Sequence, residues 1–122
     1  MASNSIVKER SEQFATRIVK MYQHLSETRH EKTLSKQVLR SGTSIGANIT
    51  EALNGISRKD FLAKMYIALK ECKETDYWLR LLHNTGYISD TEYASIAADC
   101  TELGKMLRSI TKTTAATLTP NS

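Results

Sequence analysis

The sequence has few of the residues that interrupt helices, form disulfides or bind metals. One proline and five glycines occur in 122 residues, which favours long uninterrupted elements. The two cysteines are too few for a disulfide scaffold and lack metal-ligand spacing, so we expect free thiols. Because no run approaches about 20 apolar residues and the first residues lack a signal-peptide core, we expect no membrane span and a cytoplasmic protein.

The composition predicts a single globular domain over residues 1–122. Apolar residues make up 40% of the chain and charged residues 25%, and the net charge is +4. The charge is uneven, because residues 1–80 carry 14 Lys and Arg against 9 Asp and Glu, whereas residues 81–122 carry 3 against 4. A basic N-terminal region is compatible with nucleic-acid binding, and a solvated surface gives the same bias.

Apolar residues recur at alternating three- and four-residue steps in four segments, and no segment alternates as a strand does. We predict helices over about 5–26, 33–53, 58–84 and 90–114, with a frayed tail over 115–122. Short connections force antiparallel neighbours, so the predicted fold is an all-α, up-down-up-down four-helix bundle. The expected N-caps are Asn4 or Ser5, Ser57, and Ser89 or Asp90.

Two glycines stand inside the second predicted helix, where each costs about 1 kcal/mol relative to alanine. The apolar stripe runs through them, so we predict a helix with a close neighbour, either inside the bundle or in a second subunit. Gly42 and Gly46 do not form a phosphate-binding loop, because no Gly-Lys-Ser/Thr ending follows and no strand precedes them. Arg40 and Glu51 are expected to pair along or across this interface. The predicted packing or interface residues are Gly42, Gly46, Ala47, Asn48, Glu51, Tyr77 and Trp78.

Counting residues outward from the predicted turns shows which side chains of neighbouring helices lie at the same height along the bundle, and this gives two further expectations. Asn48 lies level with Ser11 and close to the level of Thr111, and a buried unpaired amide costs about 1–3 kcal/mol. We therefore predict a polar layer joining Asn48 to Ser11, with Thr111 as a further candidate member. The alternative is that Asn48 lies at a seam and binds water. Cys72 and Cys100 also fall at similar heights and are expected to touch.

The segment Leu39–Ala52, with its Arg-Ser and Ser-Ile-Gly-Ala-Asn-Ile-Thr-Glu sequences, resembles the signature of a bacterial family of small four-helix-bundle proteins. The family is named after reading frames in the intervening sequences of 23S ribosomal RNA genes. Residues 57–61, 67–75 and 81–88 extend the resemblance to about 5–112, although Thr50 and Ala52 depart from the usual Ala and Gly. The resemblance implies a homopentameric barrel. The resemblance also extends to an accessory protein of diversity-generating retroelements, a relative that binds nucleic acid and a reverse transcriptase.

Two rows of basic residues are the candidate nucleic-acid site. One row follows a flank of the first predicted helix, and the other occurs at i, i+4, i+8 on the second. If these helices are neighbours, the rows merge into one basic strip whose phosphate binding depends on salt. The alternative is a solvated flank neutralised by four nearby glutamates. The predicted nucleic-acid-binding residues are Arg10, Arg17, Lys20, Lys32, Lys36 and Arg40.

No catalytic or metal-binding pattern emerges. Glu27-x-x-His30 has the spacing used by di-iron bundles but occurs once and at a turn, and no nucleophile motif is present. Four aromatic residues are either stacking platforms for bases or, as we favour, core and interface anchors: Tyr66, Tyr77, Trp78 and Tyr93. The leading hypothesis is therefore a non-enzymatic homo-oligomer without cofactor that binds nucleic acid, RNA rather than DNA. The rivals are a protein-binding scaffold and an enzyme with a site between subunits.

Overall fold

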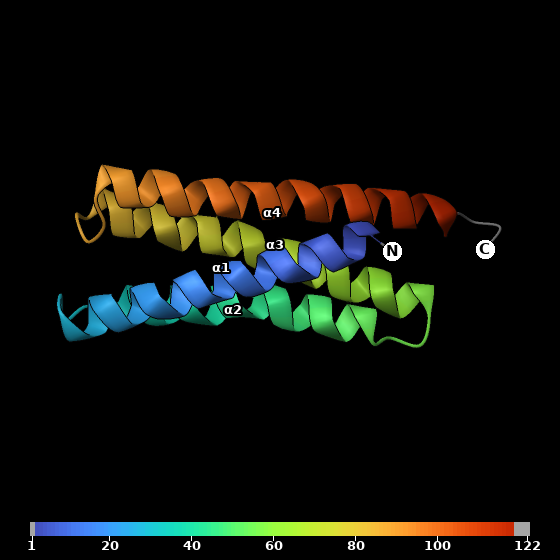
Figure 1. The fold of residues 1–122 in the computed structure, drawn as a ribbon, viewed down its shortest axis with the longest axis horizontal. Coiled ribbons are helices and arrows are strands. Elements are labelled where there is room, and N and C mark those ends of the chain that lie inside the picture. Colours follow the sequence, from blue (N-terminus) through green and yellow to red (C-terminus); the bar gives the residue numbers. More distant parts are fainter. Residues whose placement is uncertain (1, 119–122) are drawn as a thin grey trace.

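The computed structural model describes residues 2–118, and these form four helices joined by short turns (Figure 1). The helices are α1 (Ala2–Glu27), α2 (Thr33–Leu53), α3 (Arg58–Asn84) and α4 (Asp90–Thr117). Each runs antiparallel to the one before it, and no strand occurs in the described residues. The predicted all-α four-helix bundle is confirmed.

The outer helices are longer than predicted, whereas α2 and α3 have the expected bounds. α1 begins at Ala2, so neither Asn4 nor Ser5 is its N-cap. α4 continues to Thr117, so the predicted fraying of 115–117 is wrong, while residues 119–122 lie outside the described residues. The last turn of this extension contacts α3, because the Arg58 guanidinium donates to the Thr117 hydroxyl at 2.9 Å.

The N-caps of α3 and α4 agree with the sequence. The Ser57 hydroxyl accepts the Asp60 N–H at 3.1 Å. Ser89 and Glu92 form a complete capping box, in which the Ser89 hydroxyl accepts the Glu92 N–H and the Glu92 carboxylate accepts the Ser89 N–H. These hydrogen bonds hold the pKa of Glu92 below its usual range, because they stabilise its charged form.

The start of α2 depends on Glu31, whose role the sequence analysis missed. Its carboxylate accepts the backbone N–H groups of Thr33, Leu34 and Ser35 at 3.2, 3.1 and 2.8 Å. The preceding residue, His30, has a φ of 55° that turns the chain into position. A buried carboxylate thus satisfies the free amides of the first helical turn, which no Ser, Thr, Asp or Asn does here.

All four helices contribute one buried stripe to a continuous core, and no buried side-chain nitrogen or oxygen in the described residues lacks a partner. On α2 the stripe passes through Ile49, not through Asn48 as predicted. The two positions are about 100° apart on a helix, and the apolar side chain takes the interior one. The largest fully buried side chains are Phe14, Ile18, Leu25, Ile45, Ile49, Met65, Leu79, Leu82, Leu103 and Leu107.

The predicted polar layer is wrong. Asn48 is half-buried, and its side-chain amide donates to the Ser44 carbonyl of its own helix at 2.8 Å. The hydroxyls of Ser11 and Thr111 also donate to carbonyls of their own helices. Each group therefore finds a partner one turn back and needs no contact with the others.

The two glycines of α2 face α1 within the same chain. A Cβ on Gly42 would lie 3.0 Å from both Cγ atoms of Ile18, and a Cβ on Gly46 would lie 3.3 Å from the Ser11 hydroxyl oxygen. The close neighbour predicted from the sequence is therefore α1. A helix that its own composition disfavours is stabilised here by the close approach of two backbones.

Candidate nucleic-acid interface

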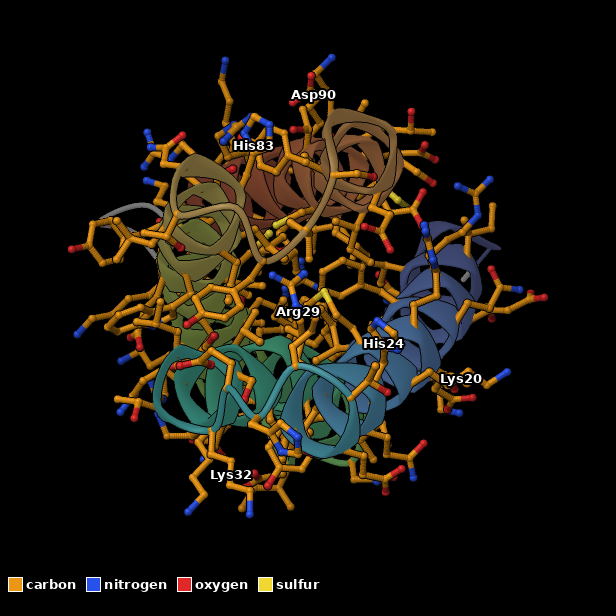
Figure 2. All side chains as sticks on the ribbon, turned by 90° about the vertical axis from the view of Figure 1, so that its left-hand side faces the viewer. Lys20, His24, Arg29, Lys32, His83 and Asp90 are labelled. Atoms are coloured by element: carbon orange, nitrogen blue, oxygen red, sulfur yellow. The ribbon has the colours of Figure 1, made fainter. Side chains whose placement is uncertain are left out.

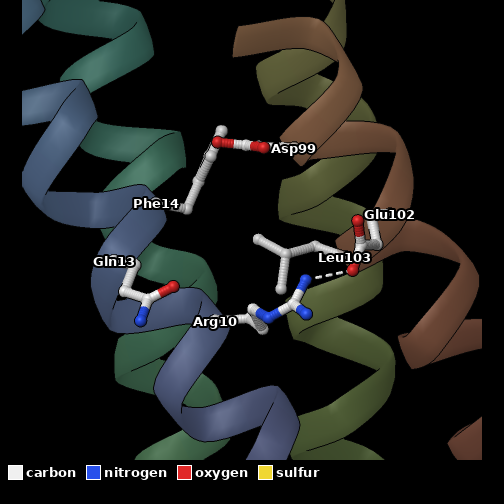
Figure 3. A pocket seen from close by; sticks show the side chains of 6 residues that line it. All are labelled: Arg10, Gln13, Phe14, Asp99, Glu102 and Leu103. Carbon is white, nitrogen blue, oxygen red and sulfur yellow. Dashed lines mark hydrogen bonds and ion pairs between the residues drawn. The ribbon is translucent and has the colours of Figure 1, made fainter. Parts of the chain in front are cut away.

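The arginines of α1 face α4, not α2. The Arg10 guanidinium pairs with the Glu102 carboxylate across a pocket of about 100 Å³ (Figure 3). Arg17 pairs with Asp99 at 2.5 Å and donates to the Ser95 hydroxyl at 2.9 Å. Both arginines therefore bridge the seam between α1 and α4, where their charges meet carboxylates.

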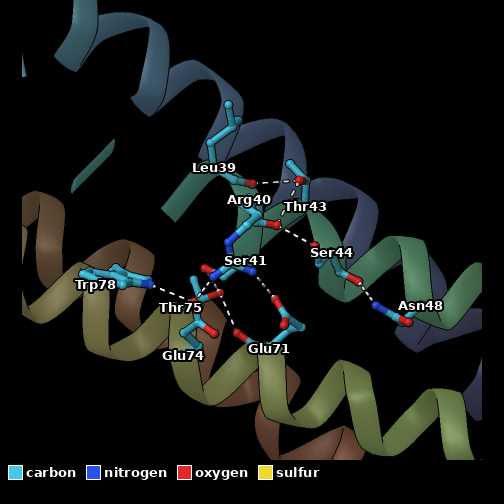
Figure 4. Close-up of polar contacts among 10 residues, drawn as sticks. All are labelled: Leu39, Arg40, Ser41, Thr43, Ser44, Asn48, Glu71, Glu74, Thr75 and Trp78. Atoms are coloured by element: carbon cyan, nitrogen blue, oxygen red, sulfur yellow. Dashed lines mark hydrogen bonds and ion pairs between the residues drawn. The ribbon is translucent and has the colours of Figure 1, made fainter. Parts of the chain in front are cut away.

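Arg40 lies on the other side of the bundle, at the seam between α2 and α3. Its guanidinium pairs with Glu71 at 3.2 Å and with Glu74 (Figure 4). The Glu74 carboxylate also accepts the indole N–H of Trp78 at 3.0 Å. Arg40 thus belongs to a polar network between two helices, above the buried hydrogen bond from Thr75 to Ser41.

The three lysines of the candidate site point away from the bundle. Lys20, Lys32 and Lys36 are exposed, and none of them forms an ion pair within residues 2–118. Figure 2 shows Lys20 projecting outward from α1 and Lys32 projecting outward from α2 at the same end of the bundle. Glu31 does not neutralise Lys32, because its carboxylate turns inward to the amides that begin α2.

The structure therefore does not merge the six basic residues into one strip. The flank of α1 that carries Arg10 and Arg17 turns toward α4, since this is the side on which α4 lies in the bundle. Three arginines meet carboxylates at two different seams, and three lysines remain without ion pairs in the described part of the chain. Of the six candidate residues, the three lysines are thus the positive charges available to a ligand, and they share this state with other exposed lysines of the described chain, namely Lys59, Lys70, Lys73, Lys105 and Lys112.

Arg29 is a basic residue that the sequence analysis did not select. Its guanidinium donates to the Tyr87 carbonyl at 3.1 Å and to the Gly86 carbonyl at 3.3 Å, and it lies 5.2 Å from the centroid of the Tyr87 ring. Figure 2 shows it directed inward between the two turns at this end of the bundle. Arg29 holds the α1–α2 turn against the α3–α4 turn. No local sequence signal marks this role, because its partners lie 57 and 58 residues away.

The remaining predicted interface residues are arranged around α2 and α3. Ala47 is exposed, and Glu51 pairs with Lys64 of α3 at 3.1 Å, not with Arg40. Tyr77 is 47% exposed, whereas Trp78 packs against the core, and their rings meet edge to face at 5.0 Å. One aromatic ring of this pair thus remains on the surface.

Nothing in the described residues forms a metal site, since no three His, Cys, Asp or Glu side chains are grouped to hold an ion. His83 pairs instead with Asp90 at 2.7 Å and stacks on Tyr93. Across residues 2–118, no helix is long and apolar enough to cross a membrane.

Comparison with known proteins identifies the family. The family model of the 23S rRNA-intervening sequence protein matches residues 3–109. The chain belongs to this family. One similar solved structure is the crystal structure of a protein of unknown function from the S23 ribosomal protein family of Bacteroides thetaiotaomicron. The sequence of that protein is 53% identical to the sequence of this chain. The alignment covers 90% of this chain and 98% of that chain, with a TM-score of 0.89. No curated protein matches the chain.

The match covers nearly all of α1, the whole of α2 and α3, and most of α4, so the family assignment includes every helix of the bundle. The resemblance read from residues 39–52 is thereby confirmed for the 23S rRNA-intervening sequence family.

Proposed function

We propose that this family member is a non-enzymatic homo-oligomer that binds nucleic acid, RNA in preference to DNA, through Lys20, Lys32 and Lys36. The observation that carries the proposal is that these three side chains, unlike the arginines of the candidate site, have no ion pair within residues 2–118, and that Lys20 and Lys32 project outward at the same end of the bundle (Figure 2). Lys32 and Lys36 lie one helical turn apart, a rise of about 6 Å that is close to the spacing of successive backbone phosphates.

Repetition around an oligomer would multiply this modest charge. Three lysines per chain give weak binding, whereas a ring of copies places several such sets along one strand. We expect a homopentamer, which light scattering would report as a mass five times 13.7 kDa. A mass of 13.7 kDa in solution would contradict the oligomer.

The binding test uses fluorescence anisotropy of a labelled, mixed-sequence single-stranded RNA at low salt. The Lys32→Glu/Lys36→Glu variant is expected to bind at least about 10-fold more weakly, because two phosphate contacts become repulsive in every subunit. The matched control is Lys105→Glu/Lys112→Glu, which makes the same charge change at exposed positions of α4. Equal loss in both variants, or no binding by the unmodified protein, would contradict the proposal.

A protein-binding scaffold is the second candidate, and exposed apolar side chains on α3 favour it. Tyr66, Ile67 and Tyr77 are 48%, 41% and 47% exposed. Aromatic side chains of this exposure are common in protein interfaces. If Tyr66→Ala/Tyr77→Ala lowers the mass in solution while RNA affinity per subunit is retained, these residues form subunit contacts. If the mass is unchanged, a different protein partner, such as the reverse transcriptase implied by the family resemblance, becomes the candidate.

A further inference from the structure

The two cysteines of the chain meet at the seam between α3 and α4. The Sγ atoms of Cys72 and Cys100 are 3.8 Å apart, which confirms the contact predicted from their heights. Each thiol also lies near the other's backbone carbonyl: Cys72 Sγ is 3.2 Å from the Cys100 oxygen, and Cys100 Sγ is 3.4 Å from the Cys72 oxygen. This reciprocal arrangement requires the two helix backbones to approach closely at the cysteines.

A surface groove of about 370 Å³ reaches both cysteines from outside. Gly104 lies beside them and leaves the groove open, since a Cβ there would lie 3.6 Å from the Cys72 sulfur. Both cysteines are nearly fully buried, at 3% and 2% exposure, so only a small reagent gains access through the groove. Large partners with their own thiols are excluded.

The two thiols are chemically unequal. The hydrogen bond from Cys100 lowers the pKa of Cys72, Arg108 in the groove adds to this effect, and burial and Asp76 oppose it. The pKa of Cys100 is raised by its hydrogen bond to Cys72 and by burial. Because Arg108 lines the groove beside the pair and its charge favours the Cys72 thiolate, we take Cys72 as the thiol that reacts first and Cys100 as the one that reacts second.

We propose that Cys72 and Cys100 form a site of reversible oxidation by small hydroperoxides, with an intrachain disulfide as the product. The Cys72 thiolate attacks one peroxide oxygen and breaks the O–O bond, which gives a sulfenic acid and releases hydroxide. Cys100 then attacks the Cys72 sulfur, its proton goes to the departing oxygen, and water leaves. The sum consumes two thiols and one hydrogen peroxide and gives one disulfide and two waters.

The product would connect α3 and α4 covalently between residues 28 positions apart. Such a bond reduces the freedom of the unfolded chain, so the oxidised protein is expected to melt about 10 °C higher than the reduced protein. The site would make the rigidity of this seam depend on the redox state of its surroundings. This role is independent of nucleic-acid binding, since none of the three candidate lysines lies in the groove.

The test treats the fully reduced full-length protein with a small excess of hydrogen peroxide and measures intact mass and free thiols after denaturation. We expect a mass lower by two hydrogen atoms, loss of both thiols, and a single peptide pair joining Cys72 to Cys100. Dithiothreitol should restore both thiols. Retention of the thiols, gain of oxygen atoms without cross-linking, or a disulfide between chains would each overturn the proposal.

Cys100→Ser supplies the matched control, because it removes the second thiol and keeps the size of the side chain. In this variant Cys72 is expected to gain oxygen atoms, with no rise in melting temperature. If Cys100→Ser fails to fold, the mass and thiol count of the unmodified protein still decide the question. The chain has no third cysteine that could form an alternative intrachain pair.

Discussion

The two flanks of α1 are attached to their neighbours in different ways. Toward α2, the absence of side chains at Gly42 and Gly46 lets the two backbones approach, so that α2 packs directly on Ile18 and Ser11. Toward α4, the helices make their fewest contacts, and long arginines cross the seam to carboxylates beside a pocket (Figure 3).

The α1–α2 contact is therefore stabilised by close packing, whereas the α1–α4 contact includes ion pairs between exposed side chains. A backbone approach has no spare volume, so an added side chain must displace the core. Exposed ion pairs are adaptable and contribute little, because solvent screens them and ordering long side chains costs entropy. The α2 side of α1 should therefore be sensitive to substitution, and the α4 side tolerant.

The largest expected effect is that of Gly42→Leu. The new side chain would overlap Ile18, whose Cγ atoms already lie 3.0 Å from the Cβ position, so we expect a loss of about 3 kcal/mol of unfolding free energy or failure to fold. Urea denaturation measures it, and Ala47→Leu at an exposed position of the same helix is the control. A Gly42→Leu variant as stable as this control would contradict the claim that the close approach of α1 and α2 leaves no room for a side chain at residue 42.

Glu31→Ala tests how much the Glu31 carboxylate stabilises the first turn of α2. Three backbone N–H groups lose a buried charged acceptor, so we expect a loss of about 2 kcal/mol, measured by thermal or urea denaturation. Glu27→Ala, an exposed carboxylate at the end of α1, should change stability by less than about 0.5 kcal/mol. Similar losses in both variants would show that the cap does not stabilise α2.

Arg17→Gln tests the tolerant flank. The side chains of Arg17 and Asp99, which form an ion pair, are 42% and 46% exposed. The expected loss of unfolding free energy is therefore about 0.5 kcal/mol, and it should be smaller in high salt because solvent ions screen the pair. Lys20→Gln, which removes the same charge without an ion pair among the described residues, is the control. A loss above about 2 kcal/mol would mean that the α4 flank depends on charge as much as the α2 flank depends on shape.

Gly46→Ala should have the smallest effect and shows how the close approach varies along one seam. The gain in helix propensity, about 1 kcal/mol, opposes a contact of 3.3 Å with the Ser11 hydroxyl, so the net change should be near zero. In a Ser11→Ala background the same change should stabilise the protein. A double-mutant cycle on unfolding free energies measures this coupling, and its absence would place Ser11 outside the contact.

Local chemistry was readable from the sequence where the signal and its partner lie close together. The hydroxyls of Ser57 and Ser89 accept backbone N–H groups three residues further along the chain. The periodic apolar residues predicted the number and the approximate bounds of the four helices. At Asn48 the sequence indicated the wrong partner, because a one-turn hydrogen bond along the helix competes with any partner on another helix.

The arrangement of charges was not predictable for a different reason. Helical spacing shows that Arg10 and Arg17 share a flank, but a bundle turning in the opposite sense would place that flank against α2. The handedness of the bundle depends on side-chain packing over the whole core, which no local pattern specifies. The outward direction of Lys20 and Lys36 was predictable, because each lies on its helix opposite the buried stripe, whereas Lys32 precedes the first residue of α2.

The contact of Arg29 with the Gly86 and Tyr87 carbonyls joins the two turns at one end of the bundle, so we expect the two ends to differ in how readily they open. At this end both turns are joined to each other, whereas the opposite end holds the α2–α3 turn, the start of α1 and the end of α4 (Figure 1). We expect opening that preserves the Arg29 contacts to begin at the opposite end, where the hydrogen bond from Arg58 to Thr117 joins only α3 to α4. Amide hydrogens near residues 55 and 115 should therefore exchange with solvent sooner than those near residues 25 and 82, in a gradient along every helix.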